Sequence, residues 1–326
     1  MDIEVTSEVD PAEWRRLTAD DRRSTFFHSL EWGRLLARTV RGFGMRYVVA
    51  RLDGRLVAGM PLMLHSRGPF AVLESMPFGT YGGPLACSVA PGDAHRELLG
   101  HAARLFRSPR VAALHVHGLP TSTVCPGPFR ALVEPAQVLR LSRPFDQILA
   151  GFKPSARNKI RKAEKAGVTV RIASSESDFV AYHGMLTECS RRWGTPVDLS
   201  RGFFVELASL GQETVQMWIA EHESQIVAGD LNFVYRDTIM NWGNVSRPQA
   251  RPLAPNNLLH TAAIRWAVEH GITVYNLGSS RGLPGVGSFK ASFGADTVDL
   301  VRLSLEKAWY RVVKTRGRRE RGDAQP

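Results

Sequence analysis

Residues 277–294, LGSSRGLPGVGSFKASFG, combine residue types that could act on a carbonyl or a phosphate. Open α/β sheets bind ligands at the carboxyl ends of their strands, and ITVYNLG reads as a strand that ends at this segment. Backbone amides freed by glycines can approach an anion closely. A lysine between two phenylalanines is partly desolvated, which strengthens its charge contacts. We therefore predict a glycine-rich loop with Lys290 as a catalytic residue, rather than a flexible turn with an exposed lysine. The predicted substrate-binding residues here are Ser279, Arg281, Gly285, Gly287 and Phe289.

Asp230 is the second candidate for chemistry, because acyl transfer to an amine needs a group that removes a proton from the attacking nitrogen. It follows Val227-Ala228-Gly229 directly. The same tripeptide occurs earlier as Val57-Ala58-Gly59, where the next residue is Met60. Asp230 is therefore predicted either as a general base or as a structural acid at a strand end.

A strongly basic helix is predicted from Pro154 to a stop at Gly167. On it, Arg157, Arg161 and Lys165 recur every four residues and form one cationic edge. Neighbouring like charges on a helix cost a few tenths of a kcal/mol per pair. The edge predicts a binding site for a polyanion, and plain solvation is the alternative.

Two histidines, His115 and His117, share one face of a strand, as metal ligands could. No third ligand has matching spacing, so the pattern favours a packed strand, and no metal site is predicted. The chain also has no nucleophile elbow of the Gly-x-Ser-x-Gly type and no P-loop.

A repeated pattern must position these residues. Residues 46–64 and 217–235 are each an apolar run, a polar turn and a second apolar run, and their Val-Ala-Gly tripeptides lie 170 positions apart. Each copy is followed by a helical pattern and a strand, at 93–118 and at 256–278. The repeat predicts two copies of one α/β domain, facing each other across a cleft.

The predicted boundaries are a first domain at 1–150, a second at 151–310 and a basic, disordered tail at 311–326. A passage rich in proline between Pro120 and Pro135 reads as the crossover. Asp10 and Pro11 are typical of a helix start, and a second helix is expected after Ser29.

Composition narrows the class of protein. The 326 residues suit two domains, and the 44% hydrophobic and 22% charged content is ordinary for a globular chain. No apolar run is long enough for a membrane helix, and the acidic start is unlike a signal peptide. Three cysteines at wide spacing indicate a reducing cytoplasm. The net charge of +11 favours a polyanionic partner or an anionic membrane face.

Several of these segments together resemble the FemABX-type aminoacyltransferases and the wider FemAB-like branch of the acetyltransferase (GNAT) superfamily. The resemblance covers most of the chain and rests on FFHSLEW, PFGTYGGP, ARNKIRKAEKAGV, RRWGTPV and LGSS…GVGSFKASFG. It implies an α/β (α+β) fold of two tandem GNAT-like domains, each a mixed sheet flanked by helices. The site is expected between the domains or in the second one.

The resemblance also implies an activity, in which an acyl or aminoacyl group moves onto an amine, often of a cell-envelope, peptidoglycan or polysaccharide precursor. The implied donor is aminoacyl-tRNA, with no bound cofactor, in the cytoplasm or peripherally at the inner membrane. Lys290 matches a lysine that contacts the acyl group or a phosphate. Arg192 matches an arginine that holds an anionic part of the acceptor, and Tyr81 of PFGTYGGP is expected to bind substrate.

Two departures from the family keep alternatives open. Lipid-linked relatives often carry an aspartate shortly after a Gly-Pro pair, whereas Gly83-Pro84 is followed here by Leu85-Ala86-Cys87, and the long coiled-coil arm of some members is missing. The alternatives are an acyl-CoA-dependent N-acyltransferase or a non-catalytic protein that binds polyanions or a membrane surface. A pyrophosphate loop for coenzyme A should precede the helix at Asn256, where the chain reads SRPQARPLAP, with three prolines and no glycine.

Overall fold

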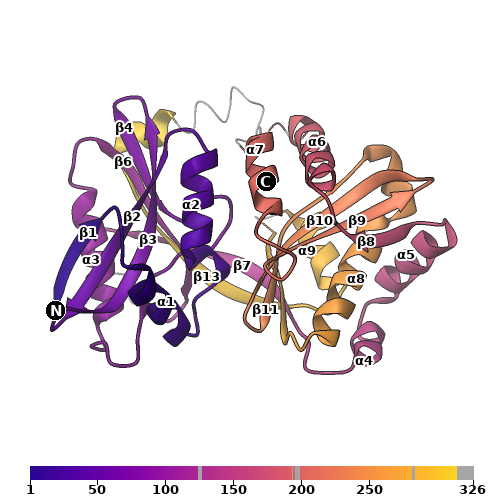
Figure 1. The fold of residues 1–326 in the computed structure, drawn as a ribbon, viewed down its shortest axis with the longest axis horizontal. Coiled ribbons are helices and arrows are strands. Elements are labelled where there is room, and N and C mark those ends of the chain that lie inside the picture. The colour runs from indigo at the N-terminus through magenta and orange to yellow at the C-terminus, as the bar shows by residue number, and fades with distance from the viewer. Residues whose placement is uncertain (124–126, 193, 195–198, 281–282, 314–326) are drawn as a thin grey trace. The chain divides into compact units, whose positions relative to one another are not determined.

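The computed structural model describes residues 1–123, 127–192, 194, 199–280 and 283–313. The chain divides into two compact units. Unit 1 comprises Met1–Glu134 and Asp299–Gln325, and unit 2 comprises Pro135–Val298. Figure 1 shows that each unit is a twisted sheet with helices packed on it.

Unit 1 is built on a mixed sheet with the strand order β1-β2-β3-β4-β6-β13. Strands β1 to β4 are antiparallel neighbours, β4 and β6 are parallel, and β13 runs antiparallel to β6. The strands are β1 (Asp2–Thr6), β2 (Phe43–Leu52), β3 (Arg55–Arg67), β4 (Phe70–Ser75), β5 (Leu85–Ala86, on β3), β6 (Val111–Pro120) and β13 (Asp296–Glu306). The helices are α1 (Pro11–Asp20), η1 (Phe26–His28), α2 (Leu30–Thr39) and α3 (Ala94–Leu105).

Unit 2 repeats this plan with the strand order β7-β12-β11-β10-β9-β8. Strands β8 to β11 are antiparallel neighbours, β11 and β12 are parallel, and β7 runs antiparallel to β12. The strands are β7 (Arg130–Arg140), β8 (Thr169–Ile172), β9 (Val215–His222), β10 (Gln225–Tyr235), β11 (Thr238–Ser246) and β12 (Val274–Ser279). The helices are α4 (Phe145–Ala150), α5 (Pro154–Lys165), α6 (Glu176–Arg192), α7 (Arg201–Ala208), η2 (Pro248–Leu253), α8 (Pro255–Glu269) and α9 (Pro284–Ala291).

The repeated Val-Ala-Gly tripeptide has the same structural cause in both units. Its glycine lies beneath an aromatic ring from the helix that covers the hairpin. A Cβ atom on Gly59 would lie 2.7 Å from Cζ3 of Trp14, and one on Gly229 would lie 2.7 Å from Cδ2 of Tyr182. Both distances are too short for any side chain, so glycine is required at each position. The predicted repeat of two α/β domains is confirmed, and each is a mixed sheet flanked by helices.

The helix starts that the sequence predicts are also confirmed. The Asp10 side chain accepts hydrogen bonds from the backbone N–H groups of Ala12 and Glu13 at the start of α1. The Ser29 side chain accepts one from Trp32 N at the start of α2. Helix α5 ends as predicted before Gly167, whose φ of +78° suits glycine.

The glycine-rich loop predicted at 277–294 is wrong in part, because Gly285, Gly287, Phe289 and Lys290 lie in α9. Pro284 occupies the first turn, where its missing N–H costs nothing, and Gly287 N donates to Leu283 O at 3.0 Å. Gly285 and Gly287 are therefore part of a helix and not of an open loop. Arg281 and Gly282 lie outside the described residues.

The limits of the two compact units differ from the predicted domain boundaries. The boundary falls between Glu134 and Pro135, so α4 belongs to unit 2. The last strand returns to unit 1, because Leu303 and Ser304 of β13 pair with Val116 and His115 of β6. Of the predicted tail, residues 311–313 are helical and 314–326 lie outside the described part of the chain. None of the helices in the described ranges has the length and apolar character needed to cross a bilayer.

Candidate functional site in unit 2

Strands β11 and β12 separate within unit 2. They pair in parallel at Thr238–Val274, Ile239–Tyr275 and Met240–Asn276, and the pairing ends there. Beyond this point β11 remains paired with β10. On β12, the Asn276 side chain accepts a hydrogen bond from Gly278 N at 2.8 Å, and Gly278 has a φ of +70°. This local turn redirects the end of β12, and the separation exposes the polar residues of β11 that follow Met240.

A quartet of polar side chains lies beside the separation. Asp230 and Asn232 on β10 are opposite Asn244 and Asn241 on β11. Asp230 and Asn232 are both 0% exposed. The Asp230 carboxylate accepts from Nδ2 of Asn241, Asn244 and Asn232 at 2.7, 3.0 and 2.9 Å. Burying a carboxylate is costly unless such donors satisfy it, and here three amide groups do so.

These hydrogen bonds fix which way two of the amides face. Asn241 and Asn244 turn their Nδ2 atoms inward to Asp230, so their Oδ1 atoms point away from the carboxylate. Both residues are half-buried, and neither Oδ1 accepts a hydrogen bond from the described residues. The quartet therefore presents amide oxygens, which accept N–H or O–H donors, on its accessible side.

His260 and Tyr275 extend the network beneath the quartet. His260 Nδ1 lies 2.7 Å from the Tyr275 hydroxyl, which lies 3.3 Å from Asn232 Oδ1 and 3.5 Å from Asp230 Oδ2. Burial lowers the pKa of His260 below its usual range, although the charge of Asp230 opposes that shift. Burial, together with Asp230, raises the pKa of Tyr275 well above its usual value. The lowered pKa favours the neutral form of His260, whose Nδ1 lies 3.8 Å from Asp230 Oδ2.

Lys290 brings a buried cation to the end of β12. It is 8% exposed, and its Nζ donates to the backbone oxygens of Gly278 and Ser279 at 3.0 and 2.9 Å. The neighbouring Phe289 and Phe293 pack on each other, with ring centroids 5.2 Å apart, and both contact the His260 ring. The predicted desolvated lysine is present, and it holds the redirected end of β12.

Four of the predicted site residues therefore come together in unit 2: Asp230, Ser279, Phe289 and Lys290. Gly285 and Gly287 lie in the same helix as Lys290. Arg192 is exposed at the end of α6, where its Nη2 lies 3.4 Å from Cys189 Sγ. Tyr81 belongs to unit 1, where its ring packs closely over Gly118.

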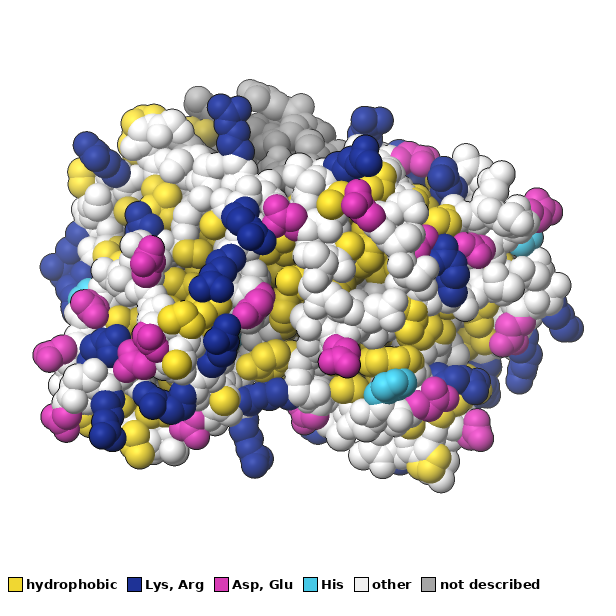
Figure 2. All heavy atoms as spheres, viewed as in Figure 1, with side chains coloured by type: hydrophobic (Ala, Val, Ile, Leu, Met, Phe, Trp, Pro, Cys, Tyr) yellow, Lys and Arg dark blue, Asp and Glu magenta, His cyan; other side chains and the backbone are white. Residues whose placement is uncertain are grey.

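The predicted cationic edge of α5 divides into two kinds of residue. Arg157 Nη1 donates to the backbone oxygens of Ala150 and Phe152, both at 2.7 Å, and so joins α5 to the end of α4. Arg161 and Lys165 are exposed, and Figure 2 shows dark blue Lys and Arg side chains at the edge of the molecule where Figure 1 places α5. Of the three predicted residues, Arg161 and Lys165 therefore remain available to a polyanion without disturbing the fold.

Sequence reasoning missed five residues of this site, namely Asn232, Asn241, Asn244, His260 and Tyr275. One signal was present, because polar residues interrupt two strands that are otherwise apolar, at Asp230 and Asn232 and again at Asn241 and Asn244. Pairing the strands as a hairpin would have placed these four on one face. His260 gave no such signal, because it is one of several polar residues in its helix.

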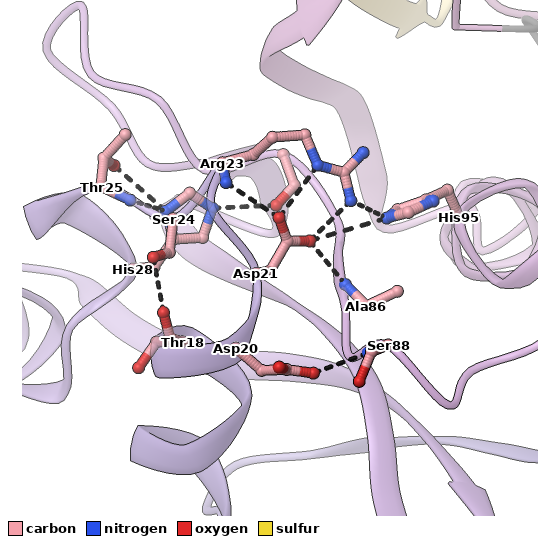
Figure 3. Close-up of polar contacts among 11 residues, drawn as sticks. Thr18, Asp20, Asp21, Arg23, Ser24, Thr25, His28, Ala86, Ser88 and His95 are labelled. Carbon is pink, nitrogen blue, oxygen red and sulfur yellow. Dashed lines mark hydrogen bonds and ion pairs between the residues drawn. The ribbon is translucent and has the colours of Figure 1, made fainter.

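Unit 1 has its own buried polar network, around Asp21, shown in Figure 3. Asp21 accepts from Arg23 Nη2 at 2.6 Å and from Ala86 N at 2.9 Å, and Arg23 also contacts His95. Burial alone would raise the pKa of Asp21, but the hydrogen bonds from Arg23 and Ala86 outweigh it and lower that pKa. The carboxylate joins the end of α1 to strand β5 and is neutralised by an arginine.

The motifs FFHSLEW and PFGTYGGP contact each other in unit 1. His28 Nδ1 accepts from Thr25 N at 3.1 Å, so its hydrogen lies on Nε2, which donates to Gly83 O at 3.0 Å. Burial lowers the pKa of His28 to about 4. His115 and His117 are likewise engaged in the sheet, with Ser304 Oγ 3.0 Å from His115 Nδ1 and Glu74 Oε1 2.8 Å from His117 Nε2.

Comparison with known proteins agrees with this architecture. Residues 151–289 match the family model described as an acetyltransferase (GNAT) domain. No curated protein matches the sequence. Among solved structures, FemX has 12% identity and a TM-score of 0.65, covering 92% of this chain and 97% of its own. The C-terminal domain of a putative lysylphosphatidylglycerol synthetase from Agrobacterium fabrum has 12% identity and a TM-score of 0.59, covering 93% and 95%.

A third solved structure is a tandem GNAT protein from the clavulanic acid biosynthesis pathway, with 14% identity and a TM-score of 0.57 over 94% of this chain and 98% of its own. At these identities the likeness is one of fold. The domain match includes Asp230 and His260 and ends at Phe289, one residue before Lys290. Residues 151–289 thus match the model of an acetyltransferase (GNAT) domain, and nearly the whole chain has a fold similar to those of FemX and the tandem GNAT protein.

Proposed function

We propose that the protein is an acyltransferase that moves an acyl or aminoacyl group onto an amine, with its reaction centre at the separation of β11 and β12. One observation carries the proposal. A buried carboxylate, two oriented amides and a buried lysine surround the point where two parallel strands of a GNAT domain part. Buried ionisable groups are expensive to maintain and concentrate at functional sites.

The reaction requires three things of the protein. The amine nitrogen attacks the carbonyl carbon, a C–N bond forms, the bond to the donor oxygen or sulfur breaks, and the proton that the amine loses passes to the departing oxygen or sulfur. The protein must orient the amine, stabilise negative charge on the carbonyl oxygen and accommodate the proton. The outward Oδ1 atoms of Asn241 and Asn244 are suited to accept hydrogen bonds from an amine.

We assign Asp230 to positioning these amides. Its carboxylate is 0% exposed and lies behind Asn241 and Asn244, so it acts on an amine through them. Lys290 holds the end of β12 and supplies a fixed positive charge beside the separation, which favours a developing oxyanion. Ser279 and Phe289 line the same region, and Arg192 and Tyr81 remain proposed contacts of the acceptor.

Aminoacyl-tRNA is the donor we favour. The connection from β11 to α8 is poor in free N–H groups, because Pro248, Pro252 and Pro255 have none and Ala250, Ala254 and Asn257 donate theirs to backbone oxygens within it. A diphosphate is bound best by several unengaged N–H groups at a helix start. The exposed Arg161 and Lys165 of α5 are suited to a polyanion such as tRNA.

An acyl-CoA-dependent N-acyltransferase is the second candidate, and the acetyltransferase family model over residues 151–289 favours it. For either donor, the proposed acceptor is an amine-bearing precursor of the cell envelope, such as a peptidoglycan precursor or a polysaccharide. The proposed location is the cytoplasm, or the inner face of the membrane.

Donor consumption tests the proposal directly. The protein is incubated with aminoacyl-tRNA carrying a labelled amino acid, with acetyl-coenzyme A, or with neither, in the presence of peptides and amino sugars that have a primary amine. We expect loss of the ester and transfer of the label to an amine. Lys290→Ala should lower turnover on the order of 100- to 1,000-fold while the circular dichroism spectrum is retained.

The matched control is Arg55→Ala, which removes an exposed cation from unit 1 and should leave turnover unchanged. Consumption of acetyl-coenzyme A alone would establish the second candidate. No consumption of either donor, or a folded Lys290→Ala variant within twofold of the wild type, would remove this centre from consideration.

A further inference from the structure

One end of unit 1 gathers four chain segments, 40–43, 68–71, 104–111 and 307–313. Ala71 N donates to Arg110 O, and Lys307 N donates to Ala112 O. Phe43 is paired with His65 and Arg67 with Phe70, which brings the starts of β2 and β4 to the same end. Figure 1 shows the yellow C-terminal turn beside the tip of β4.

Large apolar side chains are exposed at this end. Phe70 is 37% exposed, Trp309 41%, Val312 51% and Val313 60%. The rings of Phe70 and Trp309 contact each other, with centroids 4.5 Å apart. Apolar side chains that cluster on a surface indicate a binding partner, whereas scattered ones need no explanation.

The charge around these side chains has a single sign. The four segments contain no Asp or Glu, and their basic residues are Arg41, Arg104, Arg107, Arg110, Lys307 and Arg311. All of these except Lys307, which lies over the Phe106 ring, are exposed. Figure 2 shows basic and hydrophobic side chains side by side near the tip of β4. We call the exposed residues Phe70, Trp309, Val312, Val313, Arg41, Arg104, Arg107, Arg110 and Arg311 the Trp309 surface.

We propose that the Trp309 surface docks the protein on an anionic lipid bilayer. Tryptophan favours the boundary between headgroups and acyl chains, where its ring is half apolar and half hydrated. Valines beside it can enter the acyl region, and arginines around them meet the anionic headgroups. A protein partner would require acidic residues opposite five arginines, whereas a bilayer of anionic lipid supplies that charge at every point. The proposal does not depend on acyl transfer.

Vesicle sedimentation of the full chain tests the proposal. The wild type should bind vesicles of phosphatidylcholine mixed with phosphatidylglycerol, should bind pure phosphatidylcholine far less, and should dissociate as salt is raised. Changing Arg104, Arg107 and Arg110 to Gln should weaken binding to the anionic vesicles on the order of 100-fold, since each of the three lost charges contributes about fivefold. Changing Trp309, Val312 and Val313 to Ser should weaken it on the order of 10- to 100-fold.

The matched control is Val89→Ser, because Val89 is a 73% exposed valine of unit 1 that lies outside the Trp309 surface. The preceding residue, Ser88, donates its N–H to Asp20 at the end of α1. This variant should bind like the wild type. Brominated lipids should quench tryptophan fluorescence in the wild type and less in Trp309→Phe. Equal binding to both kinds of vesicle, binding to neither, or a dimer that the Trp309 variants abolish would each overturn the proposal. None of these outcomes bears on donor consumption.

Discussion

The two units share a hairpin in which a glycine, Gly59 or Gly229, lies beneath an aromatic ring. They differ at the residue that directly follows this glycine. Met60 and Asp230 occupy this position, and both are 0% exposed. Met60 packs in an apolar cluster with Leu98 and Leu99 of α3. Asp230 lies among three asparagines and His260 of α8. The same scaffold therefore buries a thioether in one unit and a carboxylate in the other.

Burial of Met60 stabilises unit 1, whereas burial of Asp230 has to be offset by hydrogen bonds. Unit 1 also buries a carboxylate, Asp21, but neutralises it with Arg23. Within the described residues, no Lys or Arg lies at ion-pair distance from Asp230. In the proposed function, this buried carboxylate beside the separated strands assigns the chemistry to unit 2 and a supporting role to unit 1.

The largest expected effect comes from exchanging the two residues. Met60→Asp places a carboxylate among Leu98, Leu99 and their neighbours, where no donor satisfies it, and should lower the free energy of unfolding by about 4 kcal/mol or more. Asp230→Met leaves three amides without their acceptor and should cost about 2 kcal/mol, since Asn241 and Asn244 can turn toward solvent. Urea unfolding measures both, and hydrogen exchange assigns each loss to its unit.

Met60→Leu is the control for unit 1, because a swap that preserves volume should cost less than about 1.5 kcal/mol. Asp230→Asn keeps the size of the side chain and should impair transfer more than folding. If Met60→Asp unfolds at the wild-type urea concentration, the Met60 position accommodates a carboxylate as the Asp230 position does, and the contrast between the two units fails.

A smaller effect concerns the buried histidine of unit 1, His28, which is hydrogen-bonded to Thr25 and Gly83. With a pKa of about 4 when folded and about 6.5 when unfolded, His28 takes up its proton mainly in the unfolded chain between these values. Stability from this group is therefore complete above pH 6.5 and falls as the pH is lowered to 4, by about 3 kcal/mol in all.

Urea unfolding of the wild type and His28→Gln at several pH values checks this expectation. The difference between the two proteins should shrink by about 3 kcal/mol as the pH falls from 6.5 to 4. The glutamine can still donate to Gly83 O, so the difference isolates the proton. Parallel stability curves would contradict the assignment. His260 should show the same sign, with the charge of Asp230 partly offsetting burial.

Local signals made much of the fold predictable. Start and stop signals correctly located several helix ends. At helix starts, the side chains of Asp10 and Ser29 accept backbone hydrogen bonds, and Pro11 and Pro154 occupy first turns. At the end of α5, the positive φ of Gly167 ends the helix. Helix α9 was not predicted from the sequence, although Pro284 is typical of a helix start. The reason is that the four glycines of this segment favoured a loop. Glycine lowers helix stability by only about 1 kcal/mol, which tertiary contacts override.

The site was harder to predict than the fold. Lys290 and Asp230 were found from their neighbours in sequence, whereas Asn241 and Asn244 matter only because strand register places them against Asp230. His260 and Tyr275 meet through a helix and a strand 15 residues apart. Strand β13 joins β6 across nearly 190 positions, as the contact between His115 and Ser304 shows. No pattern of local periodicity contains such pairings.

The smallest expected effect on stability is at the surface of α5, the basic helix of unit 2. Arg161→Glu with Lys165→Glu should change the free energy of unfolding by less than about 0.5 kcal/mol, because both side chains are exposed. If the pair contacts tRNA, the slope of log affinity against log salt should become shallower by about 1.4 to 1.8 units.

Arg157→Glu should instead lower stability, since its guanidinium joins α5 to Ala150 and Phe152. Arg34→Glu with Arg55→Glu applies the same charge change to exposed positions of unit 1 and should leave the slope unaltered. Filter-binding titrations of tRNA across a salt series decide between a contact and a solvated edge, because solvation predicts one slope for all of these proteins.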